Sequence, residues 1–171
     1  NNTAETIQTF VFHEGTPTAT ATNTPTATPT STPSCVTNAS LTSAQEVPPN
    51  NSTATGIGTV TLSADHGSIS VVLGWSNLSS NAISAHIHGP AVAGVNAPIM
   101  FPFVDVPNGT NGVTSQTFSV TPTQVAQLRA GLLYFNVHSV NFPGGEIRGQ
   151  ILPTCGQVRA DFDGDNKTDL S

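Results

Sequence analysis

Apolar and polar positions alternate through the middle of the chain with the two-residue period of a β-strand. Residues 56–62 and 68–71 alternate in this way, and the second run becomes continuously apolar at 71–73. Such patterns are typical of strands with one or both faces buried. Applied along the chain, they predict eight strands, at residues 41–46, 56–63, 68–76, 82–88, 97–103, 114–120, 132–138 and 145–152.

The segments between these runs carry turn and helix signals. Residues 64–67 (ADHG) have the composition of a hairpin turn. Thr121 as N-cap, Pro122 in the first turn and Gly131 after the last turn predict one short helix over 122–130. Short strands at regular spacing with one small helix predict an all-β fold, an antiparallel β-sandwich or barrel.

Changes in composition divide the chain into four parts. Residues 1–15 end in a short β-like run and are interpreted as the end of a preceding β domain. Residues 16–34 have Thr at every even position to 32 and four prolines, which predicts an extended Thr/Pro-rich linker. Residues 35–155 form the expected β-sandwich, and 156–171 begin a calcium-binding repeat. We interpret the chain as a fragment of a longer, multidomain protein.

Charge is scarce, and it excludes some partners. Only 8% of residues are charged, the net charge is −6, and there are four Lys and Arg in all. Nucleic acid is therefore not an expected partner, and no apolar run is long enough for a membrane span. Two cysteines, Cys35 and Cys155, bracket the sandwich; a disulfide between them indicates an exported protein, and two free thiols are the alternative.

The acidic C-terminal segment follows the ligand spacing of a calcium loop. Its aspartates at relative positions 1, 3, 5 and 9 are Asp161, Asp163, Asp165 and Asp169. Such loops add a backbone carbonyl near position 7, here Lys167. Asn166 replaces the glycine of an EF-hand. The segment instead resembles the opening of an integrin-type or VCBS (FG-GAP) repeat, which implies bound calcium; a solvated acidic tail is the alternative.

Three histidines are the strongest candidates for chemistry. His86 and His88 are two positions apart on a predicted strand, so their side chains share a face. His138 closes a strongly apolar strand, with Glu146 and Arg148 shortly after it. Neutral imidazole is a ligand for copper, zinc, nickel and iron.

Four motifs in order resemble the CHRD (chordin-type) domain over about residues 38–153. They are AQEVPP at 44–49, AHIHGPA at 85–91, GLLYFNVHS at 131–139 and FPGGEIRGQI at 142–151. The resemblance implies an immunoglobulin-like Greek-key barrel distantly similar to copper/zinc superoxide dismutase. In the dismutases, an HxH pair, a later strand histidine and an arginine form the copper site. His86, His88, His138 and Arg148 match these roles, but the bridging histidine and the zinc loop have no counterpart.

Together these features predict an extracellular, bacterial module that binds one transition metal through His86, His88 and His138. Copper is favoured and zinc is the alternative. Glu46 or Glu146 is expected to orient a ring from behind, and Arg148 to lie near the open coordination position. The alternatives are a non-catalytic adhesion or spacer module with structural histidines, another polar binding site, and a superoxide-type redox enzyme. We expect a monomeric domain whose partner is an unidentified protein or cell surface.

Overall fold

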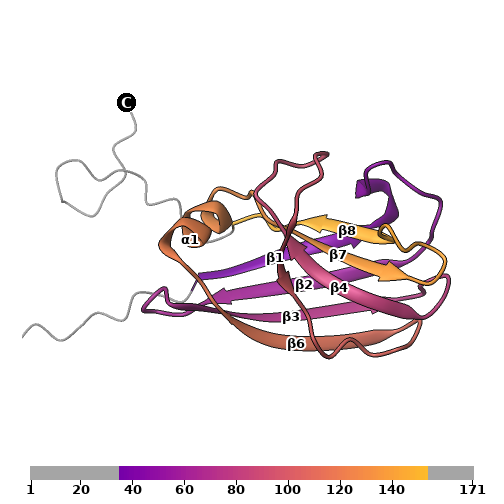
Figure 1. Ribbon diagram of the computed structural model, residues 1–171, viewed down its shortest axis with the longest axis horizontal. Coiled ribbons are helices and arrows are strands. Elements are labelled where there is room, and N and C mark those ends of the chain that lie inside the picture. The colour runs from indigo at the N-terminus through magenta and orange to yellow at the C-terminus, as the bar shows by residue number, and fades with distance from the viewer. Residues whose placement is uncertain (1–34, 154–171) are drawn as a thin grey trace, which may run out of the picture. The chain divides into compact units, whose positions relative to one another are not determined.

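The computed structural model describes residues 35–153, which form eight strands, one α-helix and one 3-10 helix (Figure 1). In chain order the elements are β1 (Cys35–Thr42), η1 (Ser43–Gln45), β2 (Thr55–Leu62), β3 (Ser68–Ser76), β4 (Ala82–His88), β5 (Ile99–Pro102), β6 (Gly112–Ser119), α1 (Pro122–Arg129), β7 (Tyr134–Ser139) and β8 (Ile147–Gln150). The predicted segments 1–15, 16–34 and 156–171, with the calcium loop, lie outside the described residues.

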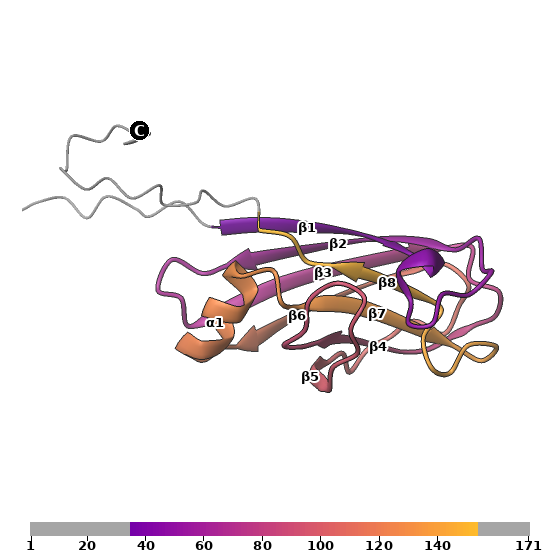
Figure 2. The same cartoon turned by 90° about the horizontal axis from the view of Figure 1, so that it is seen from above.

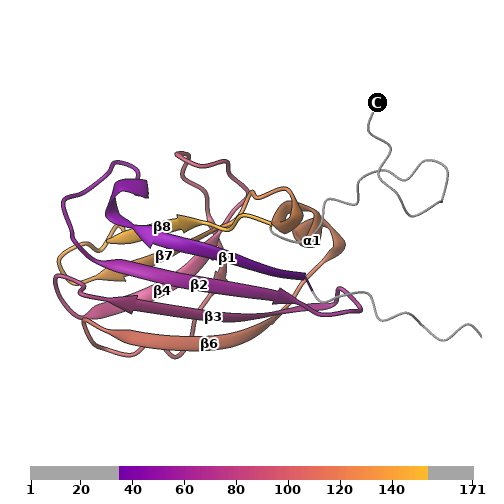
Figure 3. The same ribbon diagram turned by 180° about the vertical axis from the view of Figure 1, so that it is seen from behind.

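All strand pairs are antiparallel and belong to one sheet, in the order β5-β4-β7-β8-β1-β2-β3-β6. The sheet bends between β8 and β1, where the register consists of Thr42 opposite Arg148. The sheet folds into two layers (Figures 2 and 3). One layer contains β1, β2, β3 and β6, and the other contains β4, β5, β7 and β8. The predicted all-β fold with a single helix is confirmed, as a nearly closed barrel.

The segment after β5 narrows the remaining opening of the barrel. The backbone N–H of Val104 donates to Gln116 Oε1 over 3.1 Å, and Thr114 Oγ1 donates to the Asp105 carbonyl over 2.8 Å. Both acceptor and donor side chains come from β6, the far edge of the sheet. Strand β6 is thus linked by its side chains to the segment that follows β5.

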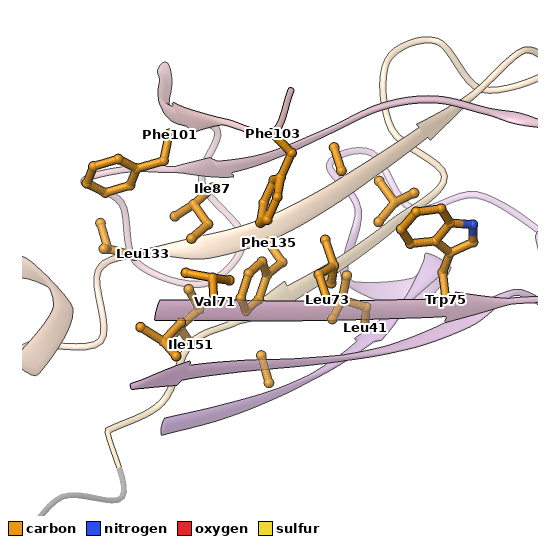
Figure 4. Packing of buried hydrophobic residues seen from close by; sticks show 14 of the residues in the cluster. Leu41, Val71, Leu73, Trp75, Ile87, Phe101, Phe103, Leu133, Phe135 and Ile151 are labelled. Atoms are coloured by element: carbon orange, nitrogen blue, oxygen red, sulfur yellow. The ribbon is translucent and has the colours of Figure 1, made fainter. Parts of the chain in front are cut away.

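Large apolar side chains from the two layers meet inside the barrel (Figure 4). Ile87 and Phe135 are fully buried, and the Phe101 and Phe103 rings lie 5.1 and 5.5 Å from the Phe118 ring. Gly58 leaves room for Phe135, because a Cβ at position 58 would lie 2.2 Å from that ring. Strand β7 can therefore pack closely against β2.

The predicted turn and helix are confirmed in detail. In the β2–β3 hairpin, Asp65 Oδ1 accepts from Ser63 Oγ over 2.6 Å and from the Gly67 N–H over 3.0 Å. Helix α1 begins with a capping box between Thr121 and Gln124, has Pro122 in its first turn, and ends before Gly131 at φ +69°.

The first strand was predicted too far along the chain. Residues 41–46 were expected to be extended, but β1 ends at Thr42 and η1 follows. The inward positions of β1 include Thr37 and Ala39, whose small or polar side chains give a weak hydrophobic pattern. Gln45 turns back to donate to the Ser40 carbonyl over 2.8 Å, which stabilises the turn where a strand was expected.

Candidate metal centre

The β4–β7 ladder brings the three histidines together on the outer face of the barrel. His86 lies opposite Asn136 and His88 opposite Tyr134, while His138 lies opposite Ser84. Alternation along β4 places the intervening Ile87 in the core. His138 is therefore a diagonal neighbour of His86 across the ladder, close enough for the two rings to touch.

This outer face is unusually well covered. Strands β2 and β3 alternate between buried and exposed positions, whereas every residue of β7 and β8 is buried. The β4–β5 loop makes part of the cover, because Gln150 donates from Nε2 to the Ala91 carbonyl over 3.0 Å and Arg148 donates to the Val95 carbonyl over 2.8 Å. The histidines thus lie in a partly desolvated setting although they point away from the core.

The ring nitrogens are close to one another. His86 Nδ1 lies 3.0 Å from His138 Nε2, and one nitrogen from each of the three rings falls within 4.8 Å of the others. The ring centroids of His86 are 5.4 Å from His88 and 4.8 Å from His138. These are the only three described residues that form such a histidine, cysteine or carboxylate group.

Backbone carbonyls determine which nitrogens are free. His88 Nδ1 lies 2.9 Å from the Ala97 carbonyl, and His138 Nδ1 lies 3.0 Å from the Pro143 carbonyl. A carbonyl only accepts, so both Nδ1 atoms carry the proton and both Nε2 atoms keep a lone pair. His138 Nε2 accepts from His86 Nδ1, whereas His88 Nε2 is buried without a hydrogen-bond partner.

The environment keeps all three rings neutral. Burial, followed by the charges of His138 and His88, lowers the pKa of His86 to about 4. Burial is also the main cause of the lowered pKa values of His88 and His138, and it outweighs the carbonyl hydrogen bonds that would raise them. Neutral imidazoles with available lone pairs are the form that a metal ion binds.

The geometry is near that of a three-histidine site. Metal–nitrogen bonds of about 2.0–2.1 Å at tetrahedral angles place ligand nitrogens about 3.3 Å apart. The His86–His138 nitrogen pair at 3.0 Å is slightly closer than this, and one nitrogen from each ring lies within 4.8 Å of the others.

Neither predicted glutamate orients a ring. Glu146 is fully buried and accepts from the Ser52 and Ser139 hydroxyls and from the Ser79 N–H. Burial by itself would raise the pKa of Glu146, but these donors outweigh it and hold the pKa below its usual value. Glu146 therefore joins the β7–β8 turn to the loops at 52 and 79 instead.

Glu46 lies on the same covered face but not against a histidine. It accepts from Asn136 Nδ2 over 2.8 Å, and burial raises its pKa to about 7 although Asn136 and the charge of Arg148 oppose this. Gly145, at φ +129°, makes this contact fit, since a Cβ there would lie 2.9 Å from Glu46 Oε1. The role of orienting the rings, expected of a glutamate, belongs to the two carbonyls.

Arg148 is separated from the histidines by Tyr134. Its guanidinium carbon lies 3.5 Å from the centroid of the Tyr134 ring, and the His88 ring stacks on Tyr134 at 5.0 Å. Because β7 lies between β4 and β8, His88 and Arg148 approach that ring from opposite neighbouring strands. The guanidinium therefore binds the β4–β5 loop, and its charge still contributes to lowering the pKa of His88.

Sequence reasoning missed Tyr134 and Asn136. Both follow from the two-residue period of β7, because they share the outer face with His138. Polar atoms at these two positions of an otherwise apolar strand could have indicated a role at the site. Tyr134 Oη accepts from the Ala97 N–H over 3.0 Å and so holds the loop that orients His88.

The remaining candidate residues lie outside the histidine cluster or outside the described residues. Cys35 is disulfide-bonded, while Cys155 lies outside the described residues, as do the calcium-loop candidates Asp161, Asp163, Asp165, Lys167 and Asp169. His66 lies away from the cluster on the β2–β3 turn, with its Nε2 2.9 Å from Arg129.

One comparison with known proteins gives a match. The family model of the CHRD domain matches residues 37–151, which agrees with the resemblance seen in the four motifs. No curated protein and no solved structure matches the chain. Among the helices of the described residues, none has the length and apolar character needed to cross a membrane.

Proposed function

Since the chain belongs to the CHRD domain family, we propose that it is an extracellular module that binds one transition-metal ion through His86, His88 and His138. The observation that carries the proposal is the buried Nε2 of His88, which has no hydrogen-bond partner, on a ring that has one nitrogen within 4.8 Å of nitrogens on the other two rings. A buried acceptor without a hydrogen bond is costly, and a metal ion would satisfy it.

The ligand atoms follow from the proton positions. His88 and His138 would each use Nε2, because their Nδ1 atoms donate to carbonyls. In the metal-free form His86 Nδ1 carries the proton donated to His138, so binding requires that this proton move to Nε2 of the same ring or that the ring turn. Copper is the favoured metal, since imidazole sites bind Cu²⁺ more tightly than the other first-row divalent ions, with zinc as the alternative.

Metal titration of the complete chain without an affinity tag tests the proposal. We expect one equivalent of Cu²⁺ to bind, with nitrogen hyperfine coupling in the electron paramagnetic resonance spectrum. His86→Ala and His138→Ala should each weaken that binding by at least about 100-fold while the fold, followed by circular dichroism, is retained.

His66→Ala is the matched control, because it removes an imidazole that lies on the β2–β3 turn against Arg129. It should bind copper like the unchanged chain. Copper binding that survives both His86→Ala and His138→Ala, or the absence of stoichiometric binding to the unchanged chain, would contradict the proposal. The histidines would then be structural, in a module that serves adhesion or spacing.

A further inference from the structure

A second polar site lies on the other side of Tyr134 from the histidines. It is a pocket of about 380 Å³ between the segment 44–49, the β4–β5 loop at 93–94, and β8. Its lining includes two charged side chains, Glu46 and Arg148. None of the three proposed metal ligands lines it, so this pocket is a different site from the proposed metal centre.

The two charges in the pocket are buried and are not paired with each other. Glu46 is 7% exposed and Arg148 is 2% exposed. The Arg148 guanidinium donates to the Asn96 side chain and the Val95 carbonyl, both neutral, and Glu46 accepts from the neutral Asn136 amide. Within residues 35–153 no carboxylate forms an ion pair with Arg148. Burial raises the pKa of Glu46 and the charge of Arg148 opposes this rise, but neither group has a hydrogen-bonded counter-charge. Burying a charge in this way is unfavourable, so each group is suited to a charged ligand group.

Gln150, which also lines the pocket, has an uncharged acceptor without a partner. Its Nε2 is already used by the Ala91 and Gly131 carbonyls, at 3.0 and 2.7 Å. Its Oε1 is buried and has no partner. A ligand that carries N–H or O–H groups would satisfy this oxygen, whereas a simple anion would leave it unpaired.

The remaining lining favours a small aliphatic body. Apart from Gln45 and the three polar side chains above, the pocket is bordered by Ala44, Val47, Pro49, Ala93 and Gly94. Apolar walls with a few convergent polar groups are typical of small-molecule sites.

We propose that this pocket binds a small zwitterion of the α-amino-acid type with an aliphatic side chain. The carboxylate pairs with Arg148, and the ammonium group donates to Glu46 and to Gln150 Oε1. A molecule with only one of the two charges leaves the opposite protein charge unpaired. The aliphatic group lies against the alanine, valine and proline side chains.

Three matched probes test the assignment on the complete chain. Leucine carries both charges, 4-methylpentanoate lacks the ammonium group, and 3-methylbutylamine lacks the carboxylate. We expect leucine to cause saturable shifts of the Glu46 and Arg148 backbone amide signals in nuclear magnetic resonance spectra. Each analogue should bind at least about tenfold more weakly, which is the loss of one paired charge.

Two variants locate the binding. Glu46→Gln keeps the shape and hydrogen bond to Asn136, and Ala93→Phe places a ring in the pocket wall; both should weaken leucine binding at least about tenfold. Val92→Phe is the control, because this exposed neighbour is not part of the lining. Equal binding of leucine and 4-methylpentanoate, unchanged binding by Glu46→Gln, or no saturable leucine binding would each overturn the assignment, whatever the copper titration shows.

Discussion

At the scale of single residues, the site depends on proton positions that a sequence does not encode. The sequence predicts the shared face of His86 and His88 and the contribution of His138. It does not predict that carbonyls of Ala97 and Pro143 hold two of the rings, because those loops are placed by tertiary contacts. The expectation that Glu146 orients a ring is wrong for the same reason, since Glu146 accepts from serines of two loops rather than from a histidine. The expected place of Arg148 near the open coordination position stays a prediction.

Acid should destabilise the metal-free protein through the histidines. Their pKa values are lowered in the folded state, for His86 to about 4 from 6.5, so the folded state resists protonation more than the unfolded state does. The stability from the neutral rings is full above pH 6.5 and is lost as the pH falls toward 4. In urea titrations, His86→Asn should lose less stability than the unchanged chain over this range; identical pH profiles would contradict the assignment.

Glu46 should act in the opposite direction. Its pKa is raised from 4.5 to about 7 on folding, so the folded state favours the protonated form. That stability is fully present below pH 4.5 and is lost as the pH rises to 7. Glu46→Gln should therefore become progressively more stable, relative to the unchanged chain, between pH 4.5 and 7. Urea titrations at several pH values measure this, and a constant difference would contradict it.

At the scale of elements, the strands were easier to predict than the cover over them. The predicted strand at 68–76 coincides with β3 and that at 82–88 with β4, because strong alternation or long apolar runs mark them. The complete burial of β7 and β8 was not predicted. It depends on loops from residues 43–50 and 89–98 folding over the outer face, and local pattern carries no signal for that.

The close approach of β7 and β2 makes Gly58 sensitive to substitution. In Gly58→Ala the new methyl group would lie 2.2 Å from the Phe135 ring, so β2 or β7 must shift. We expect a loss of about 1–3 kcal/mol in the free energy of unfolding, measured by urea denaturation. Gly144→Ala is the control, because nothing lies within 4 Å of its added Cβ. Equal stability of the two variants would show that the barrel tolerates a wider layer spacing.

At the scale of the whole molecule, the disulfide at Cys35 should be a major source of stability. Cys35 is disulfide-bonded, and the predicted partner, Cys155, closes a loop of about 120 residues. The loop-entropy relation gives about 5 kcal/mol for such a closure. Reducing agent should lower the denaturation midpoint of the unchanged chain but not that of a Cys35→Ser, Cys155→Ser variant. A midpoint insensitive to reduction would contradict the prediction.

The first and last strands of the barrel also determine how the domain would respond to pulling. Strand β1 begins at Cys35, and Asn38 forms a β-bridge with Leu152, so the chain enters and leaves the domain at neighbouring points. Tension along the chain would pass across the bridge between Asn38 and Leu152, and the barrel would lie beside the line of force. The folded domain would therefore add little to the extended length of a stretched chain.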